Sequence, residues 1–292
     1  MDYKNRQSNI ELLRIISMLM VIGLHCNFVS LGKPTVQSLL DDSFSESIRI
    51  LLENLCIVSV NTFVLISGYF GIRLRKDKLL SYFYQIFFFA TVVLLCFILF
   101  QGSLSFIDSI KFYYSYFSFN WFVPAYLCLM LFSPIINLVF DTDNVKRIGV
   151  YLLLLFVVDV VMGYVLPSVR GIGAENGYSA LHLLFLYCLG RILYIQKKSG
   201  KRLMNANVGV YLSVFLLIVV LNSMYSYGYY YYQWYHWNPI SYNNPMVIIG
   251  SVCLFLTFAN IRMKSIVVNW LASSAFFCVF ITGKYSCLSI IH

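Results

Sequence analysis

The sequence predicts an all-α protein of the polytopic membrane class, and three observations support this prediction. The 292 residues are 60% hydrophobic and only 11% charged, whereas a soluble domain carries about 25% charged residues. Apolar runs recur along the chain at bilayer-crossing length, because about 20 residues at ~1.5 Å each match a hydrocarbon core of ~30 Å. Basic residues gather in the short loops between these runs, as they do in membrane proteins.

Nine apolar runs have the composition of membrane spans. The first run, 10–28, contains Arg14 and His25, so it is read as a retained signal-anchor and not as a cleaved signal peptide. A polar loop ending near Ser47 precedes the second run, 48–72, which closes with I-S-G-Y-F-G. A Ser-, Phe- and Tyr-rich segment after the third run is a candidate interfacial helix. The later runs cover 79–100, 120–140, 148–166, 179–195, 207–225, 245–261 and 266–282.

The distribution of charge predicts a cytoplasmic N-terminus. With that orientation sixteen of the 21 lysines and arginines fall on the inner side and five on the outer side, as the positive-inside rule requires. The net charge of +9 therefore reflects topology, and nucleic-acid binding is not expected. We expect a single transmembrane domain over residues 1–292, in the cytoplasmic (inner) cell membrane and surrounded by lipid.

Two ionisable residues of the first run are predicted to share one helix face. Arg14 and His25 are eleven positions apart, which returns a helix to within about 20° and separates the two by ~16 Å along the axis. Met18 and Val21 belong to the same stripe. Ionisable groups at membrane depth cost at least ~2.5 kcal/mol each and usually face a protein interior or a wet cavity. The stripe is therefore predicted to face a protein-lined chamber.

His25 is the leading candidate for a catalytic residue. Neutral imidazole can accept a proton near pH 7, so His25 could be a general base. The alternative is a histidine that only hydrogen-bonds between helices. Arg14 on the same helix face favours the catalytic interpretation of His25, because a guanidinium at the entrance of a site can hold a phosphate or a carbonyl oxygen.

A second group of candidates lies at the end of the second run. Arg73 and Arg75 belong to a basic cluster that either anchors the topology on anionic lipid or seats a polyphosphate-bearing ligand. Ser67 and Gly68 are the small residues beside it, where a ligand could approach the backbone closely. No Walker A, dinucleotide-binding or metal-ligand motif is present, so no metal is expected.

Other polar and aromatic residues within or beside the spans allow two interpretations each. Asn120 and Trp121 lie at the start of the fourth span, where they could anchor the helix at the interface or bind substrate. Asp159 and Asn61 lie inside apolar runs, and Asp159 needs a partner or a proton that the sequence does not reveal. The tyrosine and tryptophan cluster at 229–237 is typical of an aromatic belt, or of a surface that stacks on sugar rings.

Four stretches of the sequence match the motifs of a known family. They are R-x10-H from Arg14 to His25, V-N-T-F-V-L-I-S-G-Y-F at the end of the second span, the basic segment with Arg73 and Arg75, and N-W-F-V-P-A-Y-L at the fourth span. With these stretches the chain resembles acyltransferase family 3, the integral membrane O-acyltransferases that act on cell-surface glycans.

The resemblance implies about ten helices, acetyl-CoA or another acyl-CoA as cytoplasmic donor, and a glycan hydroxyl as acceptor. It implies that His25 is catalytic and that Arg14, Arg73 and Arg75 are essential. From the chemistry of these side chains we expect His25 to act as general base or acyl carrier and Arg14 to orient the thioester or stabilise oxyanion charge. We expect Arg73 and Arg75 to hold the phosphates of the coenzyme. Other polysaccharide-biosynthesis proteins are candidate partners. Only nine spans are visible, so the C-terminal span is expected to be truncated or disrupted.

A second hypothesis is a polytopic transporter or a glycolipid or polysaccharide flippase. In that case Arg14 and His25 would bind substrate or shuttle a proton. It predicts paired broken helices and inverted repeats, and the sequence shows no convincing internal repeat.

Overall fold

The computed structural model describes residues 6–101, 105–142, 145–166, 175–201, 204, 206–234 and 236–275. All regular secondary structure in these ranges is helical, which confirms the all-α prediction for them. The elements are α1 (Ser8–Leu24), η2 (His25–Val29), α2 (Val36–Asp41), α3 (Ser43–Cys56), α4 (Val58–Phe70), α5 (Lys76–Gln101), α6 (Phe106–Phe119), α7 (Phe122–Thr142), α8 (Val145–Val157), η3 (Val158–Val165), η4 (Glu175–Gly177), α9 (Ala180–Lys198), α10 (Val208–Tyr231), α11 (Pro245–Asn260) and α12 (Ile266–Ala275).

Several helices are long and apolar enough to cross a membrane, so this is a multi-pass membrane protein. By length and composition, the described residues contain six such helices: Ser8–Val29, Ser43–Phe70, Lys76–Leu99, Phe122–Asp141, Arg147–Val165 and Val208–Tyr231. The other three predicted spans correspond to α9, α11 and α12, which are shorter or more polar. The predicted last span, 266–282, continues past Ala275, and its remainder lies outside the described residues.

The loop predicted to end near Ser47 is largely helical instead. Thr35 begins α2, where its hydroxyl accepts a hydrogen bond from the Ser38 amide at 3.1 Å. Asp42 begins α3 in the same way, with the Ser45 amide at 3.0 Å. These side chains satisfy backbone donors that the first helical turn leaves unpaired. The second span therefore starts at Ser43, earlier than its hydrophobicity indicated.

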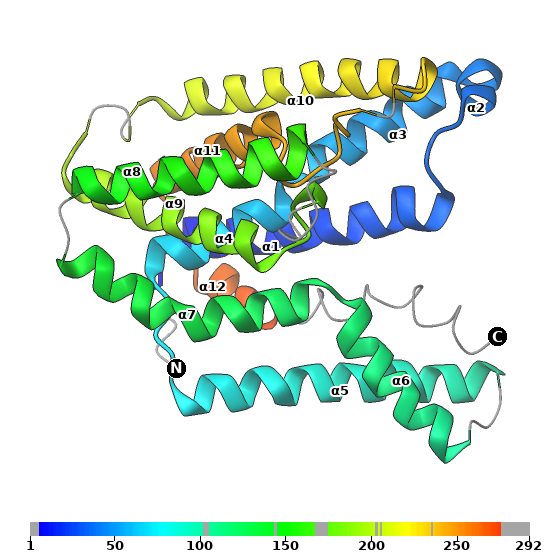
Figure 1. Cartoon of the computed structure of the whole chain (residues 1–292), viewed down its shortest axis with the longest axis horizontal. Helices are drawn as coiled ribbons and strands as arrows, with labels where there is room; N and C mark the ends of the chain where they lie inside the picture. The colour runs from blue at the N-terminus through cyan, green and yellow to red at the C-terminus, as the bar shows by residue number, and fades with distance from the viewer. Residues whose placement is uncertain are drawn as a thin grey trace.

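The segment that was predicted to form an interfacial helix is helical, as α6 (Phe106–Phe119), and its place at the interface stays a prediction. Ser105 caps it, because its hydroxyl accepts a hydrogen bond from the Asp108 amide at 3.1 Å. In Figure 1, α5 and α6 form a pair along one edge of the bundle, and α10 runs along the opposite edge. The helices that carry most candidate site residues lie between these two edges.

Helix α4 is the central helix of the bundle. Eleven of its 13 residues are buried, as expected for a helix that is apolar on every side. It packs against α9, α11 and α1, and Figure 1 shows these helices grouped around it. Residues of α1, α4 and α9 can therefore approach one another although they are far apart in the sequence.

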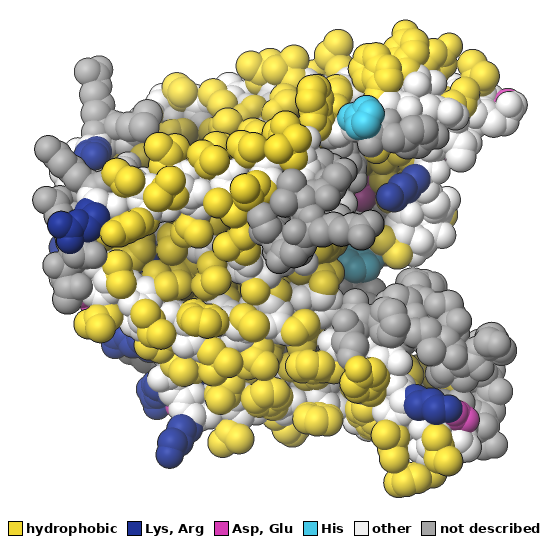
Figure 2. Space-filling model, in the orientation of Figure 1, with side chains coloured by type: hydrophobic (Ala, Val, Ile, Leu, Met, Phe, Trp, Pro, Cys, Tyr) yellow, Lys and Arg dark blue, Asp and Glu magenta, His cyan; other side chains and the backbone are white. Residues whose placement is uncertain are grey.

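Basic side chains gather mainly at one end of the bundle. Figure 2 shows most dark blue side chains along the edge where α1 and α5 begin, with a yellow apolar surface between the two ends. We call this edge the basic end. Arg73 and Arg75 belong to it, because they follow the end of α4. Arg14 and Arg191 also belong to it, because they lie against Phe70 and Gly71 at that end of α4. This arrangement is typical of a membrane protein with positive charge on one side.

Candidate functional site

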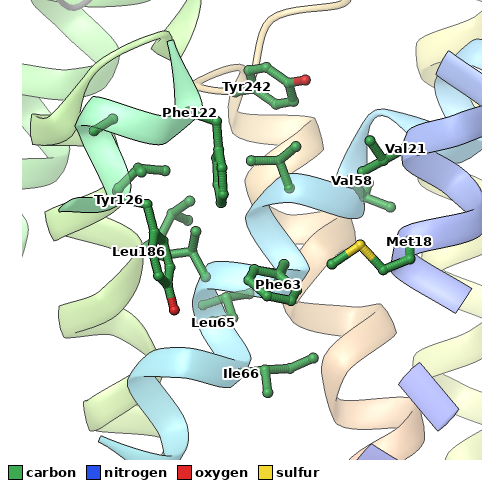
Figure 3. Close-up of a cluster of buried hydrophobic side chains, with 14 of the residues drawn as sticks. Met18, Val21, Val58, Phe63, Leu65, Ile66, Phe122, Tyr126, Leu186 and Tyr242 are labelled. Carbon is green, nitrogen blue, oxygen red and sulfur yellow. The ribbon is translucent and has the colours of Figure 1, made fainter. Parts of the chain in front are cut away.

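The stripe of α1 that was predicted to face protein does so at its centre. Met18 is 3% exposed and Val21 is 6% exposed. Figure 3 shows both side chains pointing from α1 towards Val58 and Phe63 of α4. The face that carries Arg14 and His25 therefore adjoins the core of the bundle at Met18 and Val21.

His25 lies at the transition from α1 to the π-helical turn η2. Its Nδ1 is 2.8 Å from the carbonyl oxygen of Val21. A carbonyl only accepts hydrogen bonds, so in the neutral ring Nδ1 carries the proton and Nε2 keeps a lone pair. No other residue in the described ranges hydrogen-bonds this half-buried ring. Nε2 can therefore accept a proton from a bound molecule.

Arg14 is held towards the beginning of α1 and so away from His25. Its Nη1 is 3.0 Å from Oε1 and 3.3 Å from Oε2 of Glu11, one turn closer to the N-terminus. The guanidinium lies 5.7 Å from the ring centroid of Phe70, the last residue of α4. Its side chain is 30% exposed. The structure therefore places Arg14 at the basic end and does not bring its charge to the imidazole.

Gly68 of α4 and Gly190 of α9 lie where these two helices cross. A Cβ on Gly68 would lie 2.3 Å from the carbonyl oxygen of Tyr187, and one on Gly190 would lie 2.5 Å from that of Leu65. Side chains cannot approach so closely, so both positions require glycine. Ser67 donates to the Phe63 carbonyl at 3.1 Å and shares a 3.2 Å hydrogen bond with the Tyr126 hydroxyl. Helix packing accounts for Gly68 without a ligand, and cofactor contact at Ser67 and Gly68 stays a prediction.

Arg73 and Arg75 lie on the irregular segment 71–75 between α4 and α5. Both side chains are exposed. Arg75 pairs with Asp77 at 3.0 Å, and these two side chains are 67% and 63% exposed. An ion pair so exposed contributes about 0–1 kcal/mol. Within the described part of the chain, Arg73 has no hydrogen-bond or ion-pair partner, so its guanidinium can bind a ligand.

The segment that carries these arginines is fixed at its start. The hydroxyl of Tyr187 accepts a hydrogen bond from the Ile72 amide at 2.8 Å and donates one to Asn137 Oδ1 at 2.8 Å. Asn137 Nδ2 donates to the Ile72 carbonyl at 2.9 Å. Gly71 has a φ of +73°, which favours glycine. Helices α7 and α9 thus hold the point from which Arg73 and Arg75 extend.

Asn120 and Trp121 lie at the turn between α6 and α7, with Trp121 inside an aromatic cluster. The Trp121 ring centroid is 4.9 Å from that of Tyr178 and 5.4 Å from that of Tyr242. Burial raises the pKa of the Tyr242 hydroxyl well above its usual value, and the charges of Tyr178 and Glu53 raise it further. The part-exposed face of Trp121 and the exposed Tyr178 offer flat apolar surfaces beside hydroxyl groups.

The partner of Asp159, which the sequence could not identify, is His182. Asp159 Oδ2 is 2.7 Å from His182 Nδ1, and both side chains are 0% exposed. His182 Nε2 is 3.0 Å from Asn61 Oδ1, while Asn61 Nδ2 donates to the Tyr242 carbonyl at 2.8 Å. Because that carbonyl fixes the amide, Nε2 must be the donor to Oδ1.

The hydrogen bonds of His182 also fix the charge of the Asp159–His182 pair. With Nε2 protonated, a single proton lies between Nδ1 and Oδ2, whichever atom carries it. The pair is therefore an imidazolium with a carboxylate or an imidazole with a carboxylic acid, and its net charge is zero in both cases. Both ring nitrogens are occupied, so this buried histidine has no nitrogen left for a substrate.

Sequence reasoning missed His182 and a second polar group at the far end of α1. Asn27 in η2 donates to Glu53 Oε2 at 2.9 Å and to the Arg49 carbonyl at 2.8 Å. Arg49 pairs with Glu46 at 2.7 Å. Glu53 is 5% exposed. The sequence did offer a signal for this group, because Glu53 is a charged residue within a predicted span, as Asp159 is. This group holds the turn that follows His25 against α3.

No metal cluster is found in the described ranges, where no three His, Cys, Asp or Glu side chains could hold an ion together. The described residues offer a ring nitrogen of His25 that is not hydrogen-bonded and, at the basic end, exposed guanidinium groups.

Taken together, the helices define a multi-pass membrane protein with a half-buried histidine directly after α1 and an arginine-rich end. A comparison with protein families gives the family itself. Residues 7–278 match the model of the acyltransferase family 3 domain, described as an acyltransferase domain. The chain therefore belongs to this family, as its motifs indicated. No curated protein and no solved structure matches the chain.

Proposed function

We propose that this protein moves an acetyl or other short acyl group from cytoplasmic acyl-CoA to a hydroxyl of a cell-surface or lipid-linked polysaccharide. The observation that carries the proposal is the state of His25. Its Nδ1 donates to the Val21 carbonyl at 2.8 Å, which leaves Nε2 as the basic atom on a half-buried ring. A base of this kind is what hydroxyl acylation requires.

In this proposal Nε2 of His25 accepts the proton of the acceptor hydroxyl as its oxygen attacks the acyl carbonyl. The bond from Nδ1 to Val21 orients the ring and fixes the tautomer during the transfer. The same nitrogen later returns the proton to the departing thiolate, so the histidine ends the cycle unchanged. Positioned general-base catalysis contributes typically about 10²–10⁴-fold to the rate.

The basic end fits the phosphates of an acyl-CoA donor. A coenzyme A thioester supplies the activated acyl carbonyl. Arg73 is exposed and has no protein partner in the described ranges, and Arg14 and Arg75 each have only a partly exposed ion pair. Guanidinium groups bind phosphate through paired hydrogen bonds. We therefore assign Arg14, Arg73 and Arg75 to the phosphates.

The length of α1 separates phosphate binding from proton transfer. Arg14 and His25 are eleven residues apart, or ~16 Å along a helix at ~1.5 Å per residue. The extended phosphopantetheine arm of coenzyme A is of comparable length. Because Glu11 holds Arg14 towards the basic end, we assign Arg14 to donor binding and not to stabilisation of the oxyanion.

We assign acceptor binding to the aromatic cluster at the opposite end of α4. Trp121, Tyr178 and Tyr242 present ring faces and hydroxyls together, and sugar rings stack on such faces. Asn120 adjoins them at the start of α7. With the basic end in the cytoplasm, this arrangement would let a donor from inside meet a glycan from outside. Other polysaccharide-biosynthesis proteins would supply that glycan in the same membrane.

The test is acyl transfer by the purified protein in detergent or nanodiscs. Wild-type protein should release free CoA from acetyl-CoA when a polysaccharide acceptor is added, and label the acceptor with acetyl. His25→Gln should lower the rate by at least about 100-fold while melting at an unchanged temperature. His236→Gln, at an exposed histidine, is the matched control and should stay active.

Two outcomes would contradict the proposal. Undiminished acetyl transfer by the His25→Gln protein would remove its role as base. Movement of glycolipid across the bilayer without CoA release would favour the flippase hypothesis instead. Mass spectrometry of surface polysaccharide from cells with and without the gene would then identify the acceptor.

A further inference from the structure

Arg191 in α9 is a nearly buried arginine without a hydrogen bond in the described part of the chain. Its side chain is 12% exposed, and its Nε is buried without a partner. The nearest carboxylate oxygen, Asp141 Oδ1, is 3.8 Å from Nη2 and belongs to a side chain that is 72% exposed. A guanidinium has five donors and keeps its charge. An arginine buried in this state needs an acceptor.

Arg49 is a structural arginine of this chain, and all parts of its guanidinium are hydrogen-bonded. Its side chain is 20% exposed, close to that of Arg191. Yet Nε donates to Asn27 Oδ1 at 3.2 Å, Nη1 donates to Glu46 Oε1 at 2.7 Å, and Nη2 donates to the Gly32 carbonyl. Both arginines lie over aromatic rings, Arg49 over Phe28 at 5.8 Å and Arg191 over Tyr194 at 5.5 Å and Phe140 at 6.0 Å. Those rings orient the guanidinium but accept none of its ordinary hydrogen bonds.

The position of Arg191 places it at the start of the arginine-bearing segment. A Cβ on Gly71 would lie 3.0 Å from Arg191 Nη1, so the guanidinium lies directly against this glycine. The next residue, Ile72, is tied to Tyr187 and Asn137. Tyr187 is one helical turn before Arg191 on α9. The same helix thus positions Arg191 and fixes the segment that carries Arg73.

We propose that Arg191 is an anion-binding residue that takes a phosphate group of the acyl donor together with the segment 71–75. The flat fork of a guanidinium matches two oxygens of a phosphate. Helix α9 and the aromatic rings hold that fork in place before a ligand arrives, so little side-chain freedom is lost on binding. This inference rests on the proposed function, because it names a further residue of the proposed donor site.

The experiment compares ligands with and without phosphate on wild type, Arg191→Gln and Arg191→Lys. Equilibrium binding of coenzyme A, 3′-dephospho-coenzyme A and pantetheine is measured by calorimetry on purified protein. Arg191→Gln should weaken coenzyme A binding by about 30-fold or more and change pantetheine binding less than about 2-fold. Arg191→Lys should recover part of the affinity, because it keeps the charge without the fork. Arg262→Gln, at an exposed arginine, is the matched control and should bind like wild type.

The outcomes separate this inference from the proposed function. Equal loss for coenzyme A and pantetheine, or no loss for either, would overturn the assignment of Arg191. If wild type binds no coenzyme A, the proposed donor is wrong. Stabilisation by inorganic pyrophosphate that disappears in Arg191→Gln would then still support an anion site.

A lipid headgroup could supply the same chemistry, and nanodiscs distinguish it. Melting temperatures are compared in phosphatidylcholine discs with and without phosphatidylglycerol. If Arg191→Gln abolishes stabilisation by phosphatidylglycerol but leaves coenzyme A binding intact, the ligand is lipid and the donor assignment is overturned.

Discussion

Two histidines of this protein occupy opposite environments. His25 is half-buried, bonded through Nδ1 only, and located where α1 changes into a π-helical turn. His182 is fully buried, and both of its nitrogens are bonded, to Asp159 and Asn61. A base needs a free nitrogen and access to substrate, whereas a structural histidine needs every nitrogen satisfied. The environment of His25 therefore leaves Nε2 open to a bound molecule, whereas the environment of His182 is that of a structural residue.

The largest expected effect is chemical inactivation through His25. Diethyl pyrocarbonate acylates unprotonated, accessible imidazole nitrogens. We expect peptide mass spectrometry to find His25 and the exposed His236 modified and His182 untouched, with acyl transfer reduced at least about 100-fold. In His236→Gln protein the inactivation should persist. Modification of His182 at the same rate would break the comparison.

The second effect concerns the stability that His182 provides. Asp159→Ala leaves His182 buried without its partner, and breaking a buried pair costs about 3–5 kcal/mol in free energy of unfolding. Removing both partners in Asp159→Leu/His182→Phe should restore part of this stability, because the buried pair is gone and only Asn61 Oδ1 is left without its donor. Thermal melting in detergent measures both. An Asp159→Ala protein that melts like wild type would contradict the structural assignment.

A third, smaller effect concerns the crossing of α9 over α4, the helices that bear His182 and Asn61. Gly190→Ala would place a Cβ 2.5 Å from the Leu65 carbonyl oxygen, and overpacking of this kind costs about 1–3 kcal/mol. Gly149→Ala is the control, because a Cβ there meets nothing within 4 Å and alanine favours helices by up to about 1 kcal/mol. Equal melting temperatures for the two variants would show that the helices do not cross so closely.

The smallest effect is expected beside His25. Ser30 Oγ donates to the His25 carbonyl at 2.7 Å in an exposed position. Water can replace this hydrogen bond, so Ser30→Ala should cost under about 1 kcal/mol and leave acyl transfer within about 2-fold of wild type. A large loss of transfer without a loss of stability would show that the π-helical turn itself positions the imidazole.

The composition and the motifs were enough to predict the class of this protein, and helical periodicity was enough to predict part of the candidate site. The apolar runs predicted the long helices. The R-x10-H and I-S-G-Y stretches indicated the family that residues 7–278 match. Helical periodicity predicted that Met18 and Val21 face protein, and both are buried. These features depend on residues within a few turns of each other, so the chain itself reveals them.

The start of the second span was predicted less well. Hydrophobicity placed it at residue 48, but the caps Thr35 and Asp42 begin helices in a segment that is polar on average. Polar and apolar residues are mixed at the start of α3, so a search for long apolar runs passes over its first turns.

By itself, the sequence determined the long apolar helices, the concentration of positive charge at one end, and the eleven-residue spacing of Arg14 and His25 in the first candidate span. Only the tertiary structure decided which polar residues meet. His182 and Asn61 are 121 positions apart, and Gly71 contacts Arg191 of a different helix. Hydrophobic burial is encoded locally in each helix, but a hydrogen-bond partner depends on how helices pack, and that packing is a property of the whole bundle.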